Sequence, residues 1–238
     1  MAENVFEIAG FPYEYQLKYE EFYSPYFDTK EDLNTFFVSV FKHDNVDKTP
    51  RRMMNQIYNF VTLANDIEII RPKRDPLRIL FLRTCLESLY KLNKGRQSIV
   101  NFFNDYISQE GQQYILSHFR FMGLEPDYEM DEKSRLLFDT KEYYSLSISD
   151  FSMILFRIRC MAAHEGDFWS MQVFSHDSDS IWITSMSTDE QMISCYQKCK
   201  GKLITYRFET TLNYEKFVSY FVEGCIRFLK DYISRQAI

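Results

Sequence analysis

Hydrophobic residues recur at helical spacing along most of this chain. The clearest pattern lies between Pro76 and Lys94-Gly95, residues that suit the start and the end of a helix. Its apolar stripe consists of Leu77, Leu80, Cys85, Leu86, Leu89 and Leu92. We therefore predict a long amphipathic helix over residues 77–92.

A second apolar face predicts a helix over residues 151–163, which Ser147 or Ser149 caps and Gly166 ends. The face consists of Phe151, Ile154, Leu155, Ile158 and Ala162. Weaker patterns start at Asp32 or Thr29 and at Thr49-Pro50, among other sites. Together they predict helices at about 32–41, 51–65, 98–107, 111–122, 132–144, 189–200 and 214–234.

The hydrophobic period changes from helical to alternating after Gly166. Residues 171–175 and 180–184 flank a polar turn and predict a hairpin, and residues 203–208 predict a third strand. The predicted fold class is therefore mainly α: an up-and-down helical bundle with a small antiparallel β insertion before the last helix.

The predicted elements divide the chain into two parts. Residues 1–48 form an N-terminal arm, rich in Phe and Tyr, and the first helix. Residues 49–238 form the bundle, with the β insertion at about 168–210. The rings of the arm supply contact area at low entropic cost, so we expect them first to pack on the core and second to bind a protein partner.

Composition narrows the function. The net charge of -6 disfavours a protein that coats nucleic acid by bulk electrostatics. Two local basic clusters remain candidates for contact with an RNA backbone, and their alternative role is a solvated helix start. The candidate RNA-binding residues are Arg51, Arg52, Arg71, Lys73 and Arg74.

The chain lacks the features of a secreted, membrane or cofactor-binding protein. The N-terminus has no secretory pattern, and no stretch approaches the about 20 apolar residues that span a bilayer, so we expect a soluble cytoplasmic protein that does not bind a membrane. The five cysteines are scattered, and Cys195 and Cys199 lack a second ligand pair for zinc. With no Gly-rich phosphate loop or dinucleotide fingerprint, we expect neither a metal nor a cofactor.

The segment 157–166, RIRCMAAHEG, concentrates the chemistry of the chain. An imidazole transfers protons near neutral pH, and a guanidinium binds phosphate through paired hydrogen bonds. On an α-helix, Arg157 and His164 share one stripe with Cys160, whereas Arg159 and His164 are about 140° apart. Helical geometry favours Arg157, and both arginines stay candidates.

The segment from Arg159 to His164 resembles the motif of the higher eukaryote and prokaryote nucleotide-binding (HEPN) superfamily, an Arg and a His separated by four to six residues. Arg157 and His164 fit the longest spacing. The Ala-His-Glu-Gly context, the apolar helix before it and the helix that contains Arg78 to Glu87 are also similar to that group. The resemblance covers roughly residues 50–235.

This resemblance implies an all-α bundle that forms a homodimer and, in active members, a metal-independent endoribonuclease, with toxin or defence nucleases as analogues. The 2′-hydroxyl of single-stranded RNA attacks the adjacent phosphate. His164 would transfer the protons, and Arg159 or Arg157 would stabilise the charge on the phosphate.

One departure from the family pattern supports an alternative function. Active members commonly have a polar residue after the Arg, whereas Cys160 follows Arg159 here. The alternative is a non-catalytic HEPN-like or other helical protein-interaction module, in which the arginines solvate the helix surface. Glu87 adds one further expectation: facing inward, it needs a cationic partner, and an arginine of the motif helix is the candidate.

Overall fold

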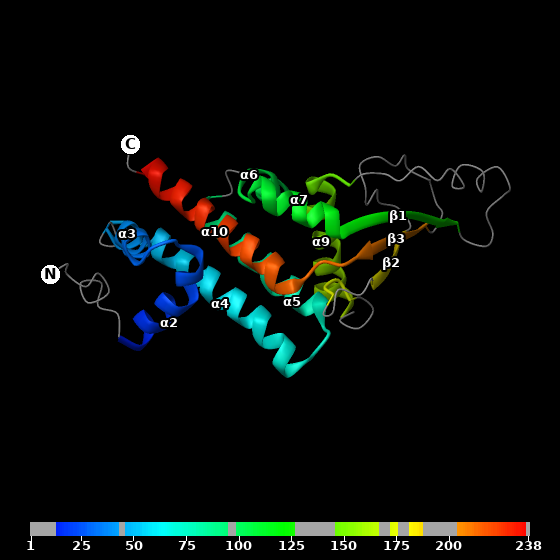
Figure 1. The fold of residues 1–238 in the computed structure, drawn as a ribbon, viewed down its shortest axis with the longest axis horizontal. Helices are drawn as coiled ribbons and strands as arrows, with labels where there is room; N and C mark the ends of the chain where they lie inside the picture. The colour runs from blue at the N-terminus through cyan, green and yellow to red at the C-terminus, as the bar shows by residue number, and fades with distance from the viewer. Residues whose placement is uncertain are drawn as a thin grey trace.

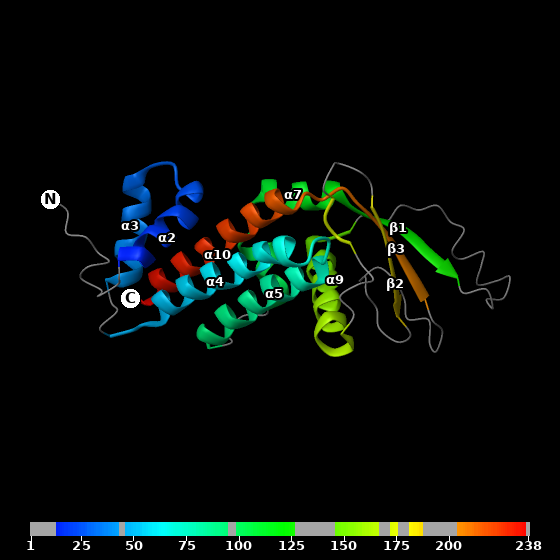
Figure 2. The same cartoon turned by 90° about the horizontal axis from the view of Figure 1, so that it is seen from below.

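Three long helices lie side by side and form the body of the molecule. They are α4 (Thr49–Ile70), α5 (Asp75–Leu92) and α10 (Tyr214–Gln236) (Figures 1 and 2). A fourth, α9 (Ile148–Cys160), crosses one end of this layer. The structure is a computed structural model, and it describes residues 13–42, 46–94, 99–126, 146–166, 172–175, 181–187 and 204–236.

Shorter elements complete the fold around these four helices. Within the described residues, no helix combines the length and the apolar character that crossing a bilayer requires. The other helical elements are α2 (Tyr13–Tyr23), η1 (Ser24–Tyr26), α3 (Lys30–Phe41), η2 (Ile99–Asn101), α6 (Phe102–Asp105), α7 (Gln109–His118) and η3 (Met161–Glu165). The strands are β1 (Phe119–Pro126), β2 (Ile181–Ser187) and β3 (Ile204–Thr210).

The helix starts follow the capping residues in the sequence. The Thr29 side chain accepts a hydrogen bond from the Asp32 backbone N–H at the start of α3. Ser147 forms a capping box with Asp150 at the start of α9, each side chain accepting the other's backbone N–H. The predicted mainly helical fold, with a small antiparallel sheet whose last two strands precede α10, is confirmed.

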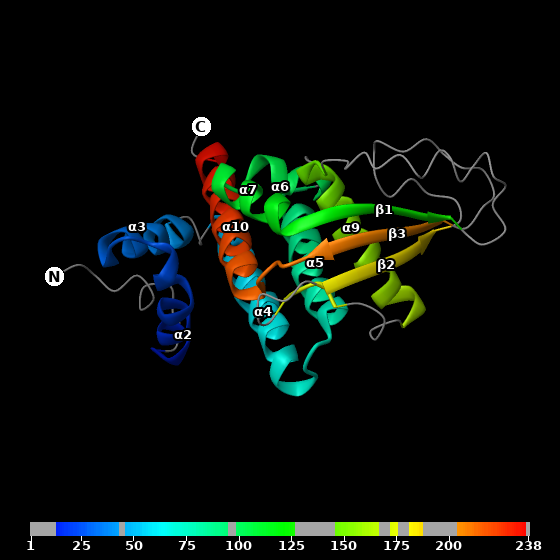
Figure 3. The ribbon, with the colours of Figure 1, turned by 45° about the vertical axis from the view of Figure 1, so that its right-hand side comes forward.

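The sheet differs from the predicted one in its strand composition. Its order is β1-β3-β2, with both neighbouring pairs antiparallel (Figure 3). The prediction of one helix over 111–122 is wrong, because α7 ends at His118 and β1 starts at Phe119. Buried Phe119 and Phe121 alternate with exposed Arg120, and both rings pack on Phe208 of β3.

Among the described residues of the predicted hairpin, 172–175 and 181–184 do not pair with each other. β2 pairs with β3, and Ser175 makes an isolated bridge to Asn213. The segment 172–175 is instead attached to the helical layer. The buried Asp75 carboxylate accepts hydrogen bonds from the backbone N–H groups of Val173 and Phe174, at 2.7 and 2.8 Å. Buried backbone donors need acceptors, and a hydrogen bond to a carboxylate is stronger than one to a neutral backbone carbonyl. Asp75 therefore takes the place of a partner strand for this segment.

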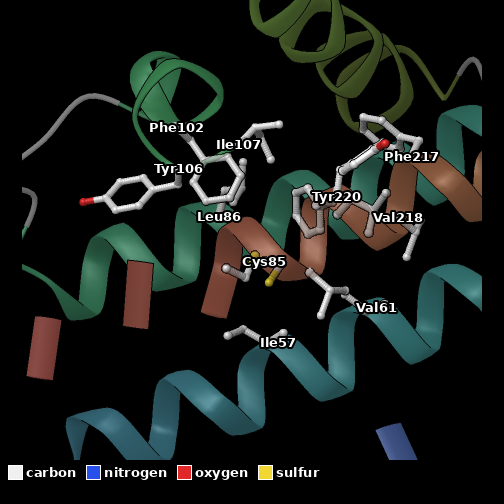
Figure 4. Close-up of a cluster of buried hydrophobic side chains, with 14 of the residues drawn as sticks. Ile57, Val61, Cys85, Leu86, Phe102, Tyr106, Ile107, Phe217, Val218 and Tyr220 are labelled. Carbon is white, nitrogen blue, oxygen red and sulfur yellow. The ribbon is translucent and has the colours of Figure 1, made fainter. Parts of the chain in front are cut away.

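The core is rich in aromatic rings that bridge helices far apart in sequence. Phe217 of α10 stacks near Phe103 of α6, and Phe151 of α9 meets both rings edge-on. Figure 4 shows the adjoining part of this core, where Ile57 and Val61 of α4 face Cys85 of α5. The bundle therefore has a continuous core into which α9 inserts its apolar face.

The described part of the N-terminal arm, from Tyr13, is helical and packs on the same core. Tyr19 and Tyr23 of α2 are buried, and the Tyr23 hydroxyl donates to the backbone carbonyl of Met54 at 2.8 Å. The Tyr19 hydroxyl donates to the side chain of Asn55. The large apolar side chains of Tyr15 and Leu17 on α2 remain exposed. The expectation that the arm's rings first serve packing is met at Tyr19 and Tyr23.

Several sequence predictions fall outside the described residues. These are the helices at 132–144 and 189–200, the turn at 176–179 and the Cys195–Cys199 pair.

Candidate functional site

The motif helix α9 is oriented by its apolar face. Phe151, Ile154, Leu155 and Ile158 are all buried, as is Ala162 in the following turn. Because these positions face the core, the arginines on the opposite side of the helix lie closer to the surface. Arg157, Arg159 and Cys160 are half-buried, and His164 is exposed. The sequence therefore places the motif at the edge of the bundle.

The helix changes its winding before it reaches the histidine. Residues Met161–Glu165 form a π-helical turn, η3, and the Gly166 N–H donates to the carbonyl of Met161. Gly166 then ends the element in the left-handed conformation, with φ 66°. The predictions of a helix over 151–163 and of its end at Gly166 are confirmed, but the winding from Met161 onward is π-helical and not α-helical.

This π turn changes the relative position of the motif residues. A π turn closes its hydrogen bonds over five residues, so each residue advances less around the axis than in an α-helix. His164 is thereby turned back toward the stripe of Arg159 and away from that of Arg157. The expected alignment of Arg157 with His164 applies only to a regular α-helix. The π turn therefore removes the α-helical preference for Arg157, and both arginines remain candidates.

Arg159 is held by a carboxylate from the neighbouring helix. Its Nη2 lies 2.9 Å from Oε2 of Glu87 on α5. The two side chains are 22% and 31% exposed, so the pair is partly shielded from water. The expectation that Glu87 pairs with an arginine of the motif helix is met by Arg159. The pair fixes the guanidinium at the α5–α9 junction.

The remaining motif residues make fewer defined contacts. Within the described part of the chain, His164 forms no hydrogen bond or ion pair, which leaves both imidazole nitrogens open to a ligand. The Nε atom of Arg159 is enclosed and has no hydrogen-bond partner among the described residues. Enclosed donors without acceptors are uncommon in proteins.

A third arginine lies beside this pair, and the sequence analysis missed it. Arg83 is one turn before Glu87 on α5 and is only 5% exposed. Its guanidinium carbon lies 5.4 Å from the ring centroid of Phe156 on α9. Burial lowers the pKa of Arg83; Glu87 opposes the shift and Arg159 adds to it. The one signal in the sequence that could have indicated Arg83 is its spacing of four residues before Glu87, which places both side chains on one face of the helix.

The two predicted basic clusters lie far from each other. Arg51 and Arg52 are in the first turn of α4, whereas Arg71 and Lys73 follow its last turn. Since α4 rises about 1.5 Å per residue, the clusters are about 30 Å apart. Arg52, Arg71 and Lys73 are exposed, and Arg51 and Arg74 are half-buried. The structure does not bring these five residues into one surface.

Other potentially reactive groups have structural roles among the described residues. Cys85 and Cys225 are buried next to each other, and burial, together with the Cys85 thiol, raises the pKa of Cys225 well above its usual range. His118 contacts the Tyr114 carbonyl and the Ser117 hydroxyl through Nδ1. In the described ranges, no three His, Cys, Asp or Glu residues are grouped as a metal site would require.

Two shallow depressions lie at the opposite end of the molecule from α9. One, of about 550 Å³, is lined by residues of α3 and the end of α10. Lys230 lies on its wall, with Nζ 4.8 Å from the ring centroid of Phe27. The other lies between α2 and α3. Neither includes a residue of the motif.

Searches with this chain against protein-family models, curated proteins and solved structures found no match. The features that carry most weight are the exposed His164 and the Arg159–Glu87 pair.

Proposed function

We propose that this protein is a HEPN-like, metal-independent endoribonuclease that cleaves single-stranded RNA. The observation that carries the proposal is the exposed His164 in the π turn that follows Arg159, whose guanidinium Glu87 holds in place. An accessible imidazole and an oriented cation at the same end of one helix supply the two groups that phosphodiester transfer requires. In the proposed site, His164 moves protons and Arg159 stabilises charge on the phosphate.

The proposed reaction needs no group outside the protein and the RNA. The 2′-hydroxyl oxygen bonds to the adjacent phosphorus as the bond from phosphorus to the 5′-oxygen breaks. A neutral imidazole accepts the 2′-hydroxyl proton, and a protonated imidazole donates a proton to the leaving 5′-oxygen. The products are a 2′,3′-cyclic phosphate and a 5′-hydroxyl end.

The reaction transfers one proton from the 2′-hydroxyl and one to the leaving 5′-oxygen, which lie on opposite sides of the phosphorus. Two copies of the motif could therefore each perform one transfer. We propose that two chains pair so that one His164 acts as base and the second copy's histidine as acid. A guanidinium at each motif would offset the negative charge that builds on the phosphate oxygens. This pairing is the homodimer that the resemblance implies.

Cleavage of a labelled single-stranded RNA in the presence of EDTA tests the proposal. The wild type is expected to cut, and His164→Ala is expected to lose at least a hundredfold in rate, in keeping with the usual contribution of a general acid or base. His118→Ala is the matched control, because His118 lies on α7 and the hydrogen bonds of its imidazole go to Ser117 and Tyr114 of the same helix. Equal losses in both variants would contradict the assignment.

A second candidate function is a non-catalytic helical module. It is favoured by Cys160, which stands where a stronger hydrogen-bonding side chain would assist catalysis, and by the neutralising effect of Glu87 on Arg159. Under this alternative, the wild type does not cut RNA and His164→Ala changes nothing measurable. The same assay therefore separates the two candidates.

A further inference from the structure

The junction of α5 and α9 contains more positive charge than the described residues around it neutralise. Arg83 and Arg159 approach this junction from different helices, and both interact with the carboxylate of Glu87. Glu87 forms its ion pair with Arg159 alone, at 2.9 Å. Two guanidinium groups thus share one carboxylate in a partly buried place.

Arg83 is the less satisfied of the two cations. Its Nε and Nη1 atoms are enclosed and have no hydrogen-bond partner, although the residue is only 5% exposed. A buried charge without a hydrogen-bonded partner is costly, so proteins rarely keep one without a use for it. The contact with Phe156 offsets part of that cost but provides no acceptor oxygen.

The surroundings of Arg83 explain why its side chain is fixed. Its stem borders a closed apolar space whose other walls include Leu82 and Leu86 of α5, Leu155 of α9 and Phe217 of α10. The stem is therefore packed, and the guanidinium is held near Glu87, Arg159 and Cys160. A guanidinium prepared in this way loses little entropy when it binds an oxyanion.

We propose that Arg83 and Arg159 form a binding site for a phosphate group at the α5–α9 junction, with Glu87 offsetting part of their positive charge when the site is empty. A phosphate has enough acceptor oxygens for both guanidiniums, and Arg binds it through two parallel hydrogen bonds. The enclosed Nε atom of Arg159, which also lacks a partner, belongs to the same set of donors.

This inference deepens the proposed function and rests on it only for the claim that the phosphate belongs to RNA. A phosphate bound here would lie beside α9. This helix continues into the π turn that contains His164. The site would hold the RNA backbone while the imidazole acts. Arg83 would then be a binding residue that contributes from a helix outside the recognised motif.

Binding of two probes to the wild-type protein and to Arg83→Met tests the inference. The first probe is inorganic phosphate, followed by thermal unfolding against chloride at equal ionic strength. The second is a labelled oligonucleotide of 2′-deoxy units, which lacks the attacking hydroxyl, followed by fluorescence anisotropy. The control variant is Arg120→Met, which also removes one guanidinium group but at an exposed position of β1.

We expect phosphate to raise the unfolding temperature of the wild type and of Arg120→Met but not of Arg83→Met. The oligonucleotide should bind Arg83→Met at least tenfold more weakly. Stabilisation by phosphate alone assigns the site to free phosphate, and binding of both probes assigns it to a nucleic-acid backbone. Equal responses in all three proteins would overturn the inference, because phosphate also stabilises proteins non-specifically.

The folding of the variant provides an independent readout. Removing an unsatisfied buried charge should leave the ligand-free stability of Arg83→Met unchanged or higher. If Arg83→Met does not fold, Arg83→Lys takes its place, since it keeps the charge and loses the paired donors, and it should also bind at least tenfold more weakly. Undiminished binding in the folded variant refutes the site. Failure of RNA cleavage with phosphate binding intact would instead refute the nuclease proposal.

Discussion

Nη2 of Arg159 lies 2.9 Å from Oε2 of Glu87, and this ion pair joins the motif helix α9 to the bundle helix α5. Its side chains are only partly buried, so its main effect is to fix the direction of the guanidinium and not to stabilise the fold.

Separate and combined replacement of Glu87 and Arg159 by Ala should give a coupling energy of about 0.5 to 1 kcal/mol in urea unfolding. Glu87→Ala should nevertheless reduce RNA cleavage more than its small effect on stability explains, because Arg159 loses its orientation. A coupling energy near zero would mean that the pair does not form in solution. Cleavage unaffected by Glu87→Ala would show that this orientation is unnecessary.

Gly166 should be sensitive to substitution although its surroundings are open. A Cβ at this position would contact nothing within 4 Å, so the cost of Gly166→Ala comes from the left-handed backbone alone. That cost is about 1 kcal/mol, and Gly166→Asn should cost less because Asn adopts this conformation more readily. Urea unfolding of both variants provides the comparison. Equal stability of Gly166→Ala and the wild type would mean that the π turn ends differently.

Asp75 should be among the residues on which stability depends most. Asp75→Asn removes the negative charge that strengthens the two backbone hydrogen bonds to Oδ2. It can also place an amide N–H group where Oδ1 lies 3.5 Å from Nη1 of buried Arg78. We expect a loss of about 3 kcal/mol. Asp28→Asn, at an exposed position, should change the free energy of unfolding by less than about 0.5 kcal/mol. Similar small losses in both variants would contradict the attachment of residues 172–175 by Asp75.

Asp47 should make stability depend on pH in the acid range. Burial alone would raise the pKa of the Asp47 carboxyl, but hydrogen bonds from Thr49 and Tyr232 outweigh it and hold the pKa below the ordinary 3.8. A lowered pKa in the folded state stabilises the fold above the unfolded value, and this contribution is lost as pH falls through the folded value. Between pH 5 and pH 2, Asp47→Asn should therefore lose less stability than the wild type. Parallel pH profiles would show that Asp47 is not responsible.

The sequence predicted the elements whose signals are local. Helices α5 and α9 each combine an apolar stripe with a cap or a stop. Within each helix, these residues lie within about twenty positions of one another. β1 was missed because its alternation covers only Phe119 to Phe121 before a bulge, and its partner β3 lies far along the chain. Pairing between distant strands leaves little trace in a local pattern.

The candidate site was predictable to a similar, partial extent. The motif residues and the partner role of Glu87 follow from side-chain chemistry and helical spacing. The π turn does not, because an extra residue in one turn depends on how α9 meets the rest of the fold. The burial of Arg83 could not be anticipated either, since a charged residue in a helix is normally solvated.

The identity of the RNA ends tests the central claim most directly. The wild type, incubated with single-stranded RNA and EDTA, should produce fragments that end in a 2′,3′-cyclic phosphate, as mass spectrometry would show. A matched substrate with one 2′-deoxy nucleotide at the cut position should stay intact there, and His164→Ala should produce neither fragment. Cleavage at the deoxy position, fragments from His164→Ala, or a wild type that leaves RNA intact would contradict the account.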